Sequence, residues 1–200
     1  GSFGDIAASS FGGMVYYTSP DRSSLLEQLQ STSIKKICDA DWKDLTIERL
    51  PGIPNFTLLV GWTGQVAITD SLIQATEKKR KVETDSTFYK EFLSKSHTIV
   101  QGLQSAWNKQ DIPALQEGIR SNRALLNEFA QEMQLEIETP ALQTLCDIAE
   151  QNGACAKTSG AGGGDCGICF TQNETQRQQI ETQWAKAQIQ VLPLTIAEAW

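Results

Sequence analysis

One stretch near the end of the chain is suited to binding a ligand through its backbone. Residues 158–167 read TSGAGGGDCG and contain five glycines. Glycine tolerates positive φ and lets the backbone approach another group closely, but ordering it costs entropy. Consecutive free N–H groups can surround an anion, and phosphate is the usual candidate. The loop therefore suggests a phosphate site, although a glycine-rich turn also has purely structural uses.

The loop does not match either of the common nucleotide-binding motifs. No Lys-Ser or Lys-Thr pair follows its last glycine, as the pattern GxxxxGK[ST] requires. Residues 162–167 fit GxGxxG formally, but the next residues are Ile168, Cys169 and Phe170, which predict a strand where a dinucleotide site needs a helix. Any phosphate site here must have another architecture.

Other residue types that could do chemistry carry weaker signals. The five cysteines are odd in number and irregularly spaced, which predicts reduced and mostly buried thiols. Cys166 and Cys169 form one CxxC pair, but zinc sites of this kind need a second pair, so we expect no metal site. His97 lies off the apolar stripe of its expected helix and is interpreted as a surface or structural residue.

Composition limits the classes of partner. The chain has 17 basic and 24 acidic residues, a net charge of −7, which argues against binding nucleic acid or an anionic membrane. It contains no apolar run of the roughly 20 residues needed to cross a bilayer and no start typical of a signal peptide. We expect a cytoplasmic protein whose phosphate site is local, built from backbone groups and a few lysines. Nothing in the sequence indicates the oligomeric state.

The elements that position these residues predict an α+β fold with an antiparallel or mixed sheet. Asp5 lies in the first turn of a short helix that Gly12 and Gly13 end. Helices are also expected over 22–33, over a stripe from Phe88 to Trp107, and after Asp111, Thr139 and Asn173. Strands are expected at residues 14–17, 45–50, 56–60, 167–170 and 189–194.

Three segments in this order resemble motifs of a known enzyme family. The entry GSFGDIAASSFGG, the strand end VGWTGQVAITDSLI and the late KTSGAGGGDCGICF are similar to the second and third motifs of the GHMP small-molecule kinases, most closely those of the bacterial phosphomevalonate kinases. Mevalonate kinases typically carry Pro-Ser-Gly-x-Asp-Asn in the first of these segments, and residues 2–8 depart from that form. The resemblance extends from Gly1 to about Leu194.

The resemblance implies a two-domain GHMP kinase fold, with ATP and a small acceptor meeting between the domains. Residues 1–35 would be the end of the N-terminal domain, and residues 36–200 a ferredoxin-like C-terminal domain. The family's first motif, a glycine- and serine-rich loop that holds the ATP phosphates and magnesium, has no equivalent in this sequence. We therefore expect the chain to be the C-terminal part of a longer protein and to be inactive alone.

The implied reaction is the phosphorylation of 5-phosphomevalonate by ATP, with Mg²⁺, to give 5-diphosphomevalonate in the mevalonate route to isoprenoids. Two alternatives stay open. The chain could belong to another GHMP member, a mevalonate kinase or a diphosphomevalonate decarboxylase. As an isolated piece it could also act as a ferredoxin-like binding module without catalysis.

The resemblance also implies roles for individual residues. Asp5 matches the family's acidic active-site position. If the acceptor is a phosphate monoester, it is mostly dianionic near pH 7, because its second pKa is about 6. Asp5 would then position groups and balance charge, with no need for a strong base. The residues implied to bind phosphate or substrate are Ser2 and Gly4, then Trp62, Thr63 and Gly64, then Lys157, Ser159, Gly160, Ala161, Gly162, Gly163 and Asp165.

Overall fold

The computed structural model describes residues 3–64, 87–160 and 162–197. The chain divides into two compact units, one formed by Gly1–Gly52 with Ile196–Trp200 and the other by Ile53–Thr195. The domain boundary expected after residue 35 falls inside the first unit. The reason is the pairing of β1 (Met14–Thr18) with β2 (Thr46–Leu50), which keeps both strands in one unit.

The first unit places a short helix beside a two-stranded antiparallel sheet. Helix α1 (Gly4–Phe11) contacts β1, and its C-cap Gly12 has φ 64°, as the sequence predicts for a glycine stop. Between the strands the chain forms α2 (Arg22–Ser31) and α3 (Ile34–Cys38), the second of which the sequence pattern did not predict. Asp21 caps α2 by accepting a hydrogen bond from the Ser24 amide at 3.2 Å.

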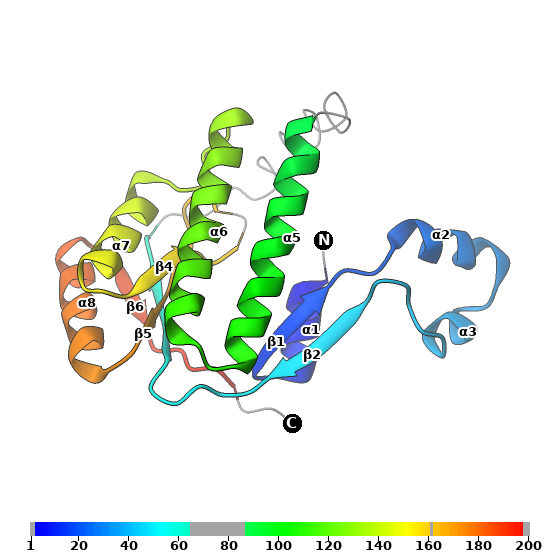
Figure 1. Ribbon diagram of the computed structural model, residues 1–200, viewed down its shortest axis with the longest axis horizontal. Helices are drawn as coiled ribbons and strands as arrows, with labels where there is room; N and C mark the ends of the chain where they lie inside the picture. The colour runs from blue at the N-terminus through cyan, green and yellow to red at the C-terminus, as the bar shows by residue number, and fades with distance from the viewer. Residues whose placement is uncertain (1–2, 65–86, 161, 198–200) are drawn as a thin grey trace. The chain divides into compact units, whose positions relative to one another are not determined.

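The second unit is built on a four-stranded antiparallel sheet. Its strands lie in the order β4 (Cys155–Thr158), β5 (Cys166–Thr171), β3 (Thr57–Trp62) and β6 (Gln190–Leu192). Numbered along the chain as first to fourth, these strands are arranged 2-3-1-4, with helices after the first and third (Figure 1). This is the ferredoxin-like arrangement, so the predicted α+β class is confirmed.

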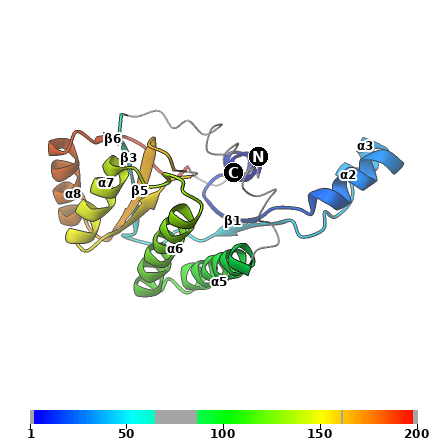
Figure 2. The ribbon, with the colours of Figure 1, turned by 90° about the horizontal axis from the view of Figure 1, so that it is seen from above.

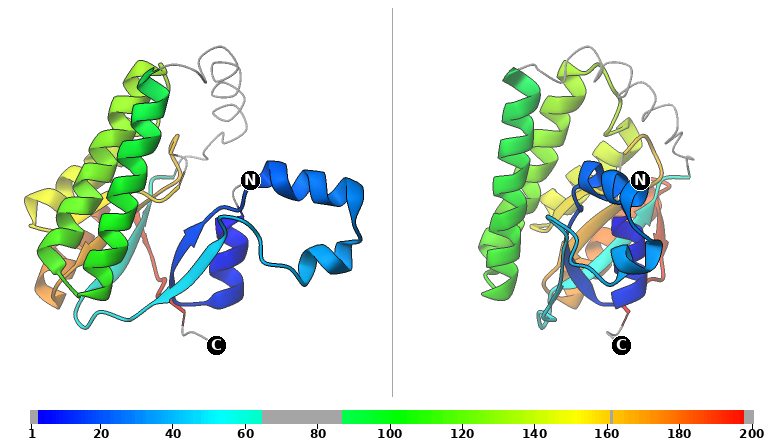
Figure 3. Two further views of the ribbon diagram at one scale, coloured as in Figure 1. Left: turned by 45° about the vertical axis from the view of Figure 1, so that its right-hand side comes forward. Right: turned by 90° about the vertical axis from the view of Figure 1, so that its right-hand side faces the viewer.

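Four helices complete this unit, and the last three of them begin where the sequence predicts. They are α5 (Thr87–Asn108), α6 (Ile112–Glu132), α7 (Pro140–Gln151) and α8 (Glu174–Lys186). Side chains of Asp111, Thr139 and Asn173 accept hydrogen bonds from backbone amides of the first turns of α6, α7 and α8. Helices α5 and α6 lie side by side as an antiparallel pair (Figure 3). No helix of the described ranges is long and apolar enough to cross a bilayer.

Helices α7 and α8 cover one face of the sheet (Figure 2) and form the main core of the unit. Leu145 of α7 and Trp184 of α8 are fully buried there, and the Trp184 indole N–H donates to the Leu145 carbonyl at 3.0 Å. On the opposite face the ring of Phe170 stacks on Phe56 at 4.8 Å between centroids and meets Trp107 edge-on at 5.9 Å. Both faces of β5 are therefore packed.

Two strands differ from the sequence prediction. Strand β4 was not predicted, because it is only four residues long and carries a lysine at its third position. The last strand ends at Leu192, before the predicted Leu194. Pro193 explains the early end, because proline has no N–H to donate to a neighbouring strand.

Replacing Gly61 should destabilise the second unit. A Cβ at Gly61 would lie 2.8 Å from Leu145 and 3.0 Å from both Ile189 and Trp184, all of them buried. Gly61→Ala should therefore lower the free energy of unfolding by about 1–3 kcal/mol, measured by denaturant titration. Gly102→Ala is the control: its Cβ would meet nothing within 4 Å in α5, so we expect a gain of about 0.5–1 kcal/mol. Equal effects of the two variants would contradict the close packing over Gly61.

Candidate functional site

The glycine loop joins β4 to β5 and has a backbone that only glycine adopts easily. Gly162, Gly163 and Gly164 have φ angles of 82°, 84° and 129°. A Cβ at Gly162 would lie 2.2 Å from the carbonyl oxygen of Ile137, in the segment between α6 and α7. The loop thus needs glycine for two reasons, positive φ and backbone resting directly on backbone.

Two of the N–H groups expected to face a ligand are used inside the chain. The Ser159 amide donates to the Cys166 carbonyl at 3.0 Å, and the Gly163 amide donates to the Ile137 carbonyl at 2.8 Å. The amides of Gly160 and Gly162 make no hydrogen bond to another described residue. Ala161 lies outside the described residues. The donors left for an anion are therefore fewer than the sequence suggested.

The second predicted segment lies against this loop. Trp62 pairs with Cys166 in the register of β3 and β5. Just beyond it, the Thr63 amide donates to the Asp165 carbonyl at 3.0 Å, and the Thr63 hydroxyl lies 3.0 Å from the carbonyls of both Gly164 and Asp165. Gly64 follows with φ 77°. The structure thus brings Trp62 and Thr63 beside Gly164 and Asp165 at one end of the sheet, although about 100 residues separate them in sequence.

Lys157 brings a positive charge to the strand that enters the loop. Its register partner is Ile168, so it lies on the sheet face opposite the α7–α8 core. The ammonium donates to the Thr158 carbonyl at 2.7 Å and forms no ion pair with a described carboxylate. Burial lowers the pKa of Lys157, because the protein disfavours the charged form. The adjacent Thr158 hydroxyl is buried without a hydrogen-bond partner among the described residues.

Asp165 is exposed at the far end of the loop. Its carboxylate lies 3.6 Å from the Cys166 sulfur, and burial together with this negative charge raises the pKa of the Cys166 thiol. The thiol is therefore protonated at neutral pH and weakly nucleophilic. Within the described ranges, no three His, Cys, Asp or Glu side chains gather as metal ligands do.

Asp5 and Gly4 stand at the start of α1 in the first unit. Asp5 is exposed, and its position in the first turn is favourable for a carboxylate because the helix dipole is positive there. Phe3, which precedes the helix, has φ 65° and provides no side-chain cap; the guanidinium of Arg22 lies 5.7 Å from its ring centre. Ser2 lies outside the described residues.

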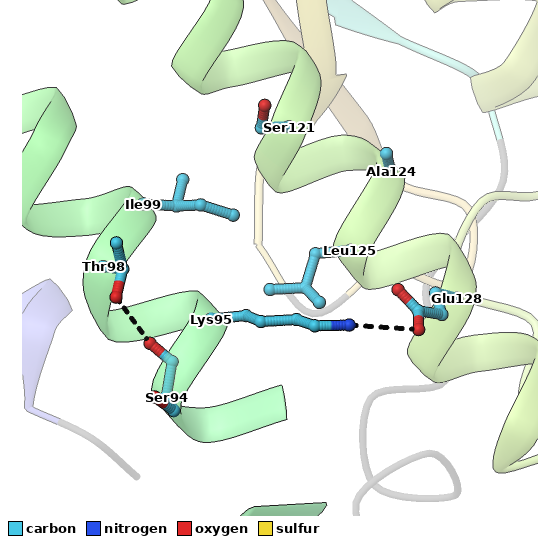
Figure 4. A pocket seen from close by; sticks show the side chains of 8 residues that line it. All are labelled: Ser94, Lys95, Thr98, Ile99, Ser121, Ala124, Leu125 and Glu128. Atoms are coloured by element: carbon cyan, nitrogen blue, oxygen red, sulfur yellow. Dashed lines mark hydrogen bonds and ion pairs between the residues drawn. The ribbon is translucent and has the colours of Figure 1, made fainter. Parts of the chain in front are cut away.

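A separate hollow lies between α5 and α6, and none of the residues that line it is a predicted site residue (Figure 4). Its volume is about 480 Å³. Lys95 of α5 and Glu128 of α6 reach across it with 3.5 Å between nitrogen and oxygen, both about half exposed. The apolar side chains of Ile99 and Leu125 line its wall (Figure 4). This open groove shares no residue with the glycine-loop site.

Comparison with known proteins gives the chain a family. Residues 103–190 match the family model described as GHMP kinases C terminal. Over 199 residues, 98% of its length, the chain is 37% identical to the phosphomevalonate kinase of Streptomyces sp. (strain CL190), of which it covers 53%. Residues 103–190 therefore carry the C-terminal region of a GHMP kinase. The chain spans about half the length of the relatives that it matches.

Solved structures agree with this assignment. A Lin0012 protein from Listeria innocua is 32% identical, with a TM-score of 0.94 over 100% of this chain and 56% of its own. The Streptococcus pneumoniae phosphomevalonate kinase in complex with phosphomevalonate and AMPPNP is 28% identical, with a TM-score of 0.80 over 96% of this chain and 54% of its own. The L. major mevalonate kinase shares the fold at 18% identity and a TM-score of 0.73.

The sequence did not predict which residues outside the glycine loop form hydrogen bonds with it. Ile137 accepts the hydrogen bond of the loop through its backbone carbonyl, which no side-chain pattern reveals. Nor did the sequence predict that Thr63 would bond the loop itself, since a threonine after a strand has many uses.

Replacing Gly162 should disorder the loop. Gly162→Ala places a methyl group against the Ile137 carbonyl in a strained backbone conformation, and we expect a loss of about 1–3 kcal/mol in the free energy of unfolding. Gly160→Ala is a matched control two residues away, because its Cβ would meet nothing within 4 Å. Thermal unfolding of both variants measures the difference. A Gly162→Ala variant as stable as Gly160→Ala would disprove the close contact.

Proposed function

We propose that the protein transfers the γ-phosphoryl group of ATP to 5-phosphomevalonate, giving 5-diphosphomevalonate and ADP. The observation that carries the proposal is the 37% identity to a phosphomevalonate kinase over 98% of this chain. The solved Streptococcus pneumoniae relative, which holds phosphomevalonate and the ATP analogue AMPPNP, supports it. In this proposal the first unit is the end of the N-terminal kinase domain, the second is the C-terminal domain, and the reaction is cytoplasmic because its charged substrates do not cross membranes unaided.

The chemistry of the glycine loop suits phosphoryl transfer. Such transfer depends on alignment and on stabilising the charge of the phosphoryl oxygens, with little covalent work for the protein. The amides of Gly160 and Gly162 offer donors without adding charge, and the Lys157 ammonium offers a cation with no carboxylate partner among the described residues. A half-buried cation of this kind stabilises a phosphate more strongly than an exposed one, because less water screens it.

Asp5 serves the same reaction by positioning groups and balancing charge. A phosphate monoester acceptor has lost its second proton near pH 7, since that pKa is about 6. The attacking oxygen is then already anionic, and a general base adds little. Asp165 is proposed as a further polar group beside the phosphates.

ATP is the proposed phosphoryl donor, and magnesium would neutralise part of the phosphate charge when it is bound. The residues that would meet the phosphates are Gly160 and Gly162, through their amides, and Lys157. Their donor chemistry fits an anion. We assign no magnesium ligand, since the carboxylates of the described ranges do not cluster.

Acceptor specificity tests the proposal directly. The complete natural protein, supplied with ATP and Mg²⁺, should release ADP with 5-phosphomevalonate in a coupled assay and not with mevalonate or 5-diphosphomevalonate. Turnover should fall below about pH 6, where the acceptor becomes protonated. Turnover with mevalonate alone would identify a mevalonate kinase, and phosphate release with loss of CO₂ from 5-diphosphomevalonate would identify the decarboxylase.

Lys157→Met should separate binding from stability. Removing a half-buried charge that lacks a carboxylate partner among the described residues should raise the free energy of unfolding by about 0.5–2 kcal/mol, while the KM for a phosphorylated substrate rises. Lys95→Met removes an exposed lysine from the α5–α6 groove and should change stability by no more than about 1 kcal/mol and leave KM unchanged. Denaturant titration and steady-state kinetics give the two readouts. A Lys157→Met variant with unaltered KM values would remove this residue from the proposed site.

A further inference from the structure

The glycine loop packs on the segment that joins α6 to α7, and this segment is itself held by hydrogen bonds. Gly163 donates to the Ile137 carbonyl at 2.8 Å, and Gly162 leaves no room for a side chain above the same carbonyl. Ile137 is buried and lies between the end of α6 and the start of α7. The position of the loop therefore depends on what fixes the peptide that joins Ile137 to Glu138.

Glu138 is anchored by two side chains of α6. The guanidinium of Arg123 binds its carboxylate with two nitrogens, Nε at 2.8 Å from Oε2 and Nη2 on Oε1. Asn127 Nδ2 adds a third bond to Oε2 at 3.1 Å. Only 7% of the Glu138 side chain is exposed, so little water competes for these bonds. The planar guanidinium fixes both the distance and the angle of the carboxylate.

The same arginine ties this segment to the next helix. Arg123 Nη2 also binds the Asp147 carboxylate of α7 at 3.0 Å. Burial raises the pKa of Glu138, but hydrogen bonds from Arg123 and Asn127 outweigh it, so the net pKa lies below the ordinary value. Glu138 is thus ionised at neutral pH, and the pair is charge-assisted.

We propose that Arg123 and Asn127 are positioning residues for the glycine loop, acting through the Glu138 carboxylate and the neighbouring Ile137 carbonyl. In this role the Gly163 amide binds the loop to Ile137, and the amides of Gly160 and Gly162 stay available to donate hydrogen bonds to a phosphate. The kinetic part of the inference rests on the proposed function, whereas the structural part stands without it. The physical reason is alignment: a shift of about 1 Å in groups that meet the transferring phosphoryl can cost about 100-fold in rate.

The test replaces Arg123 in the complete natural protein. Arg123→Met should speed amide hydrogen exchange in peptides covering residues 159–165 by about tenfold, because the loop loses its fixed support. In the coupled assay it should lower kcat by about tenfold or more and raise the KM for ATP or for the phosphorylated acceptor. A variant that was merely less folded would lower kcat and leave both KM values unchanged.

Arg120→Met is the matched control. Arg120 also lies in α6 and also pairs with a carboxylate of α7, with 2.7 Å between its Nε and Glu150 Oε2. Arg120 Nη2 also donates to the Ala154 carbonyl at 3.1 Å, just before β4 begins. Neither of these two bonds goes to Ile137 or Glu138. We expect its loop exchange and KM values to match those of the wild type.

A second variant covers the case in which Arg123→Met leaves Glu138 buried and unpaired and does not fold. Arg123→Met combined with Glu138→Met removes both charges and keeps apolar volume, which proteins often tolerate. Loop exchange should still be faster than in Arg120→Met. Unchanged loop exchange in a folded variant would overturn the positioning role. If the wild type itself shows no transfer to 5-phosphomevalonate, the proposed function fails, and the exchange comparison still decides the role of Arg123.

Discussion

The contact between the glycine loop and the Ile137 carbonyl is the constraint on which the site in the second unit depends. The Gly163 amide donates to the Ile137 carbonyl at 2.8 Å, and the preceding glycine, Gly162, packs on the same oxygen with no space for a methyl group. Such a contact fixes the loop without side chains, and so the loop amides can face a ligand in a defined direction. The loop conformation therefore depends on its contact with Ile137 as well as on its own sequence.

That support extends back into the core of the unit. Leu145 of α7 packs directly over the sheet, where Gly61 and Gly167 have no side chain to keep it away. A Cβ at Gly167 would lie 2.6 Å from Leu145. Two glycines in the strands thus let α7 approach the sheet closely, and α7 begins at Pro140, three residues after Ile137.

The site also carries features that cost stability. Lys157 is half-buried without a carboxylate partner in the described ranges, and the neighbouring Thr158 hydroxyl is buried without a hydrogen bond there. Three consecutive glycines adopt positive φ. Uncompensated polar groups and unusual backbone conformations persist where function requires them. Their concentration at the two ends of one loop agrees with a role in binding an anion.

The sequence by itself determined the local features of this protein. The helix starts at Asp111, Thr139 and Asn173 and the glycine stop after α1 depend on residues a few positions apart, and so they could be predicted. The order of the three motifs was sufficient to indicate the family. The five glycines indicated an unusual loop, though not which of its amides stay available.

Only the tertiary structure decided which residues meet. The unit boundary after Gly52 follows from the pairing of β1 with β2, and the use of the Gly163 amide follows from a carbonyl 26 residues earlier in the chain. Thr63 reaches Asp165 across 102 residues, and Arg123 reaches Glu138 across 15. Such contacts leave no local pattern in the sequence, because they depend on how strands pair and helices pack. A backbone carbonyl is present in every residue, so residue type does not mark the one that is used.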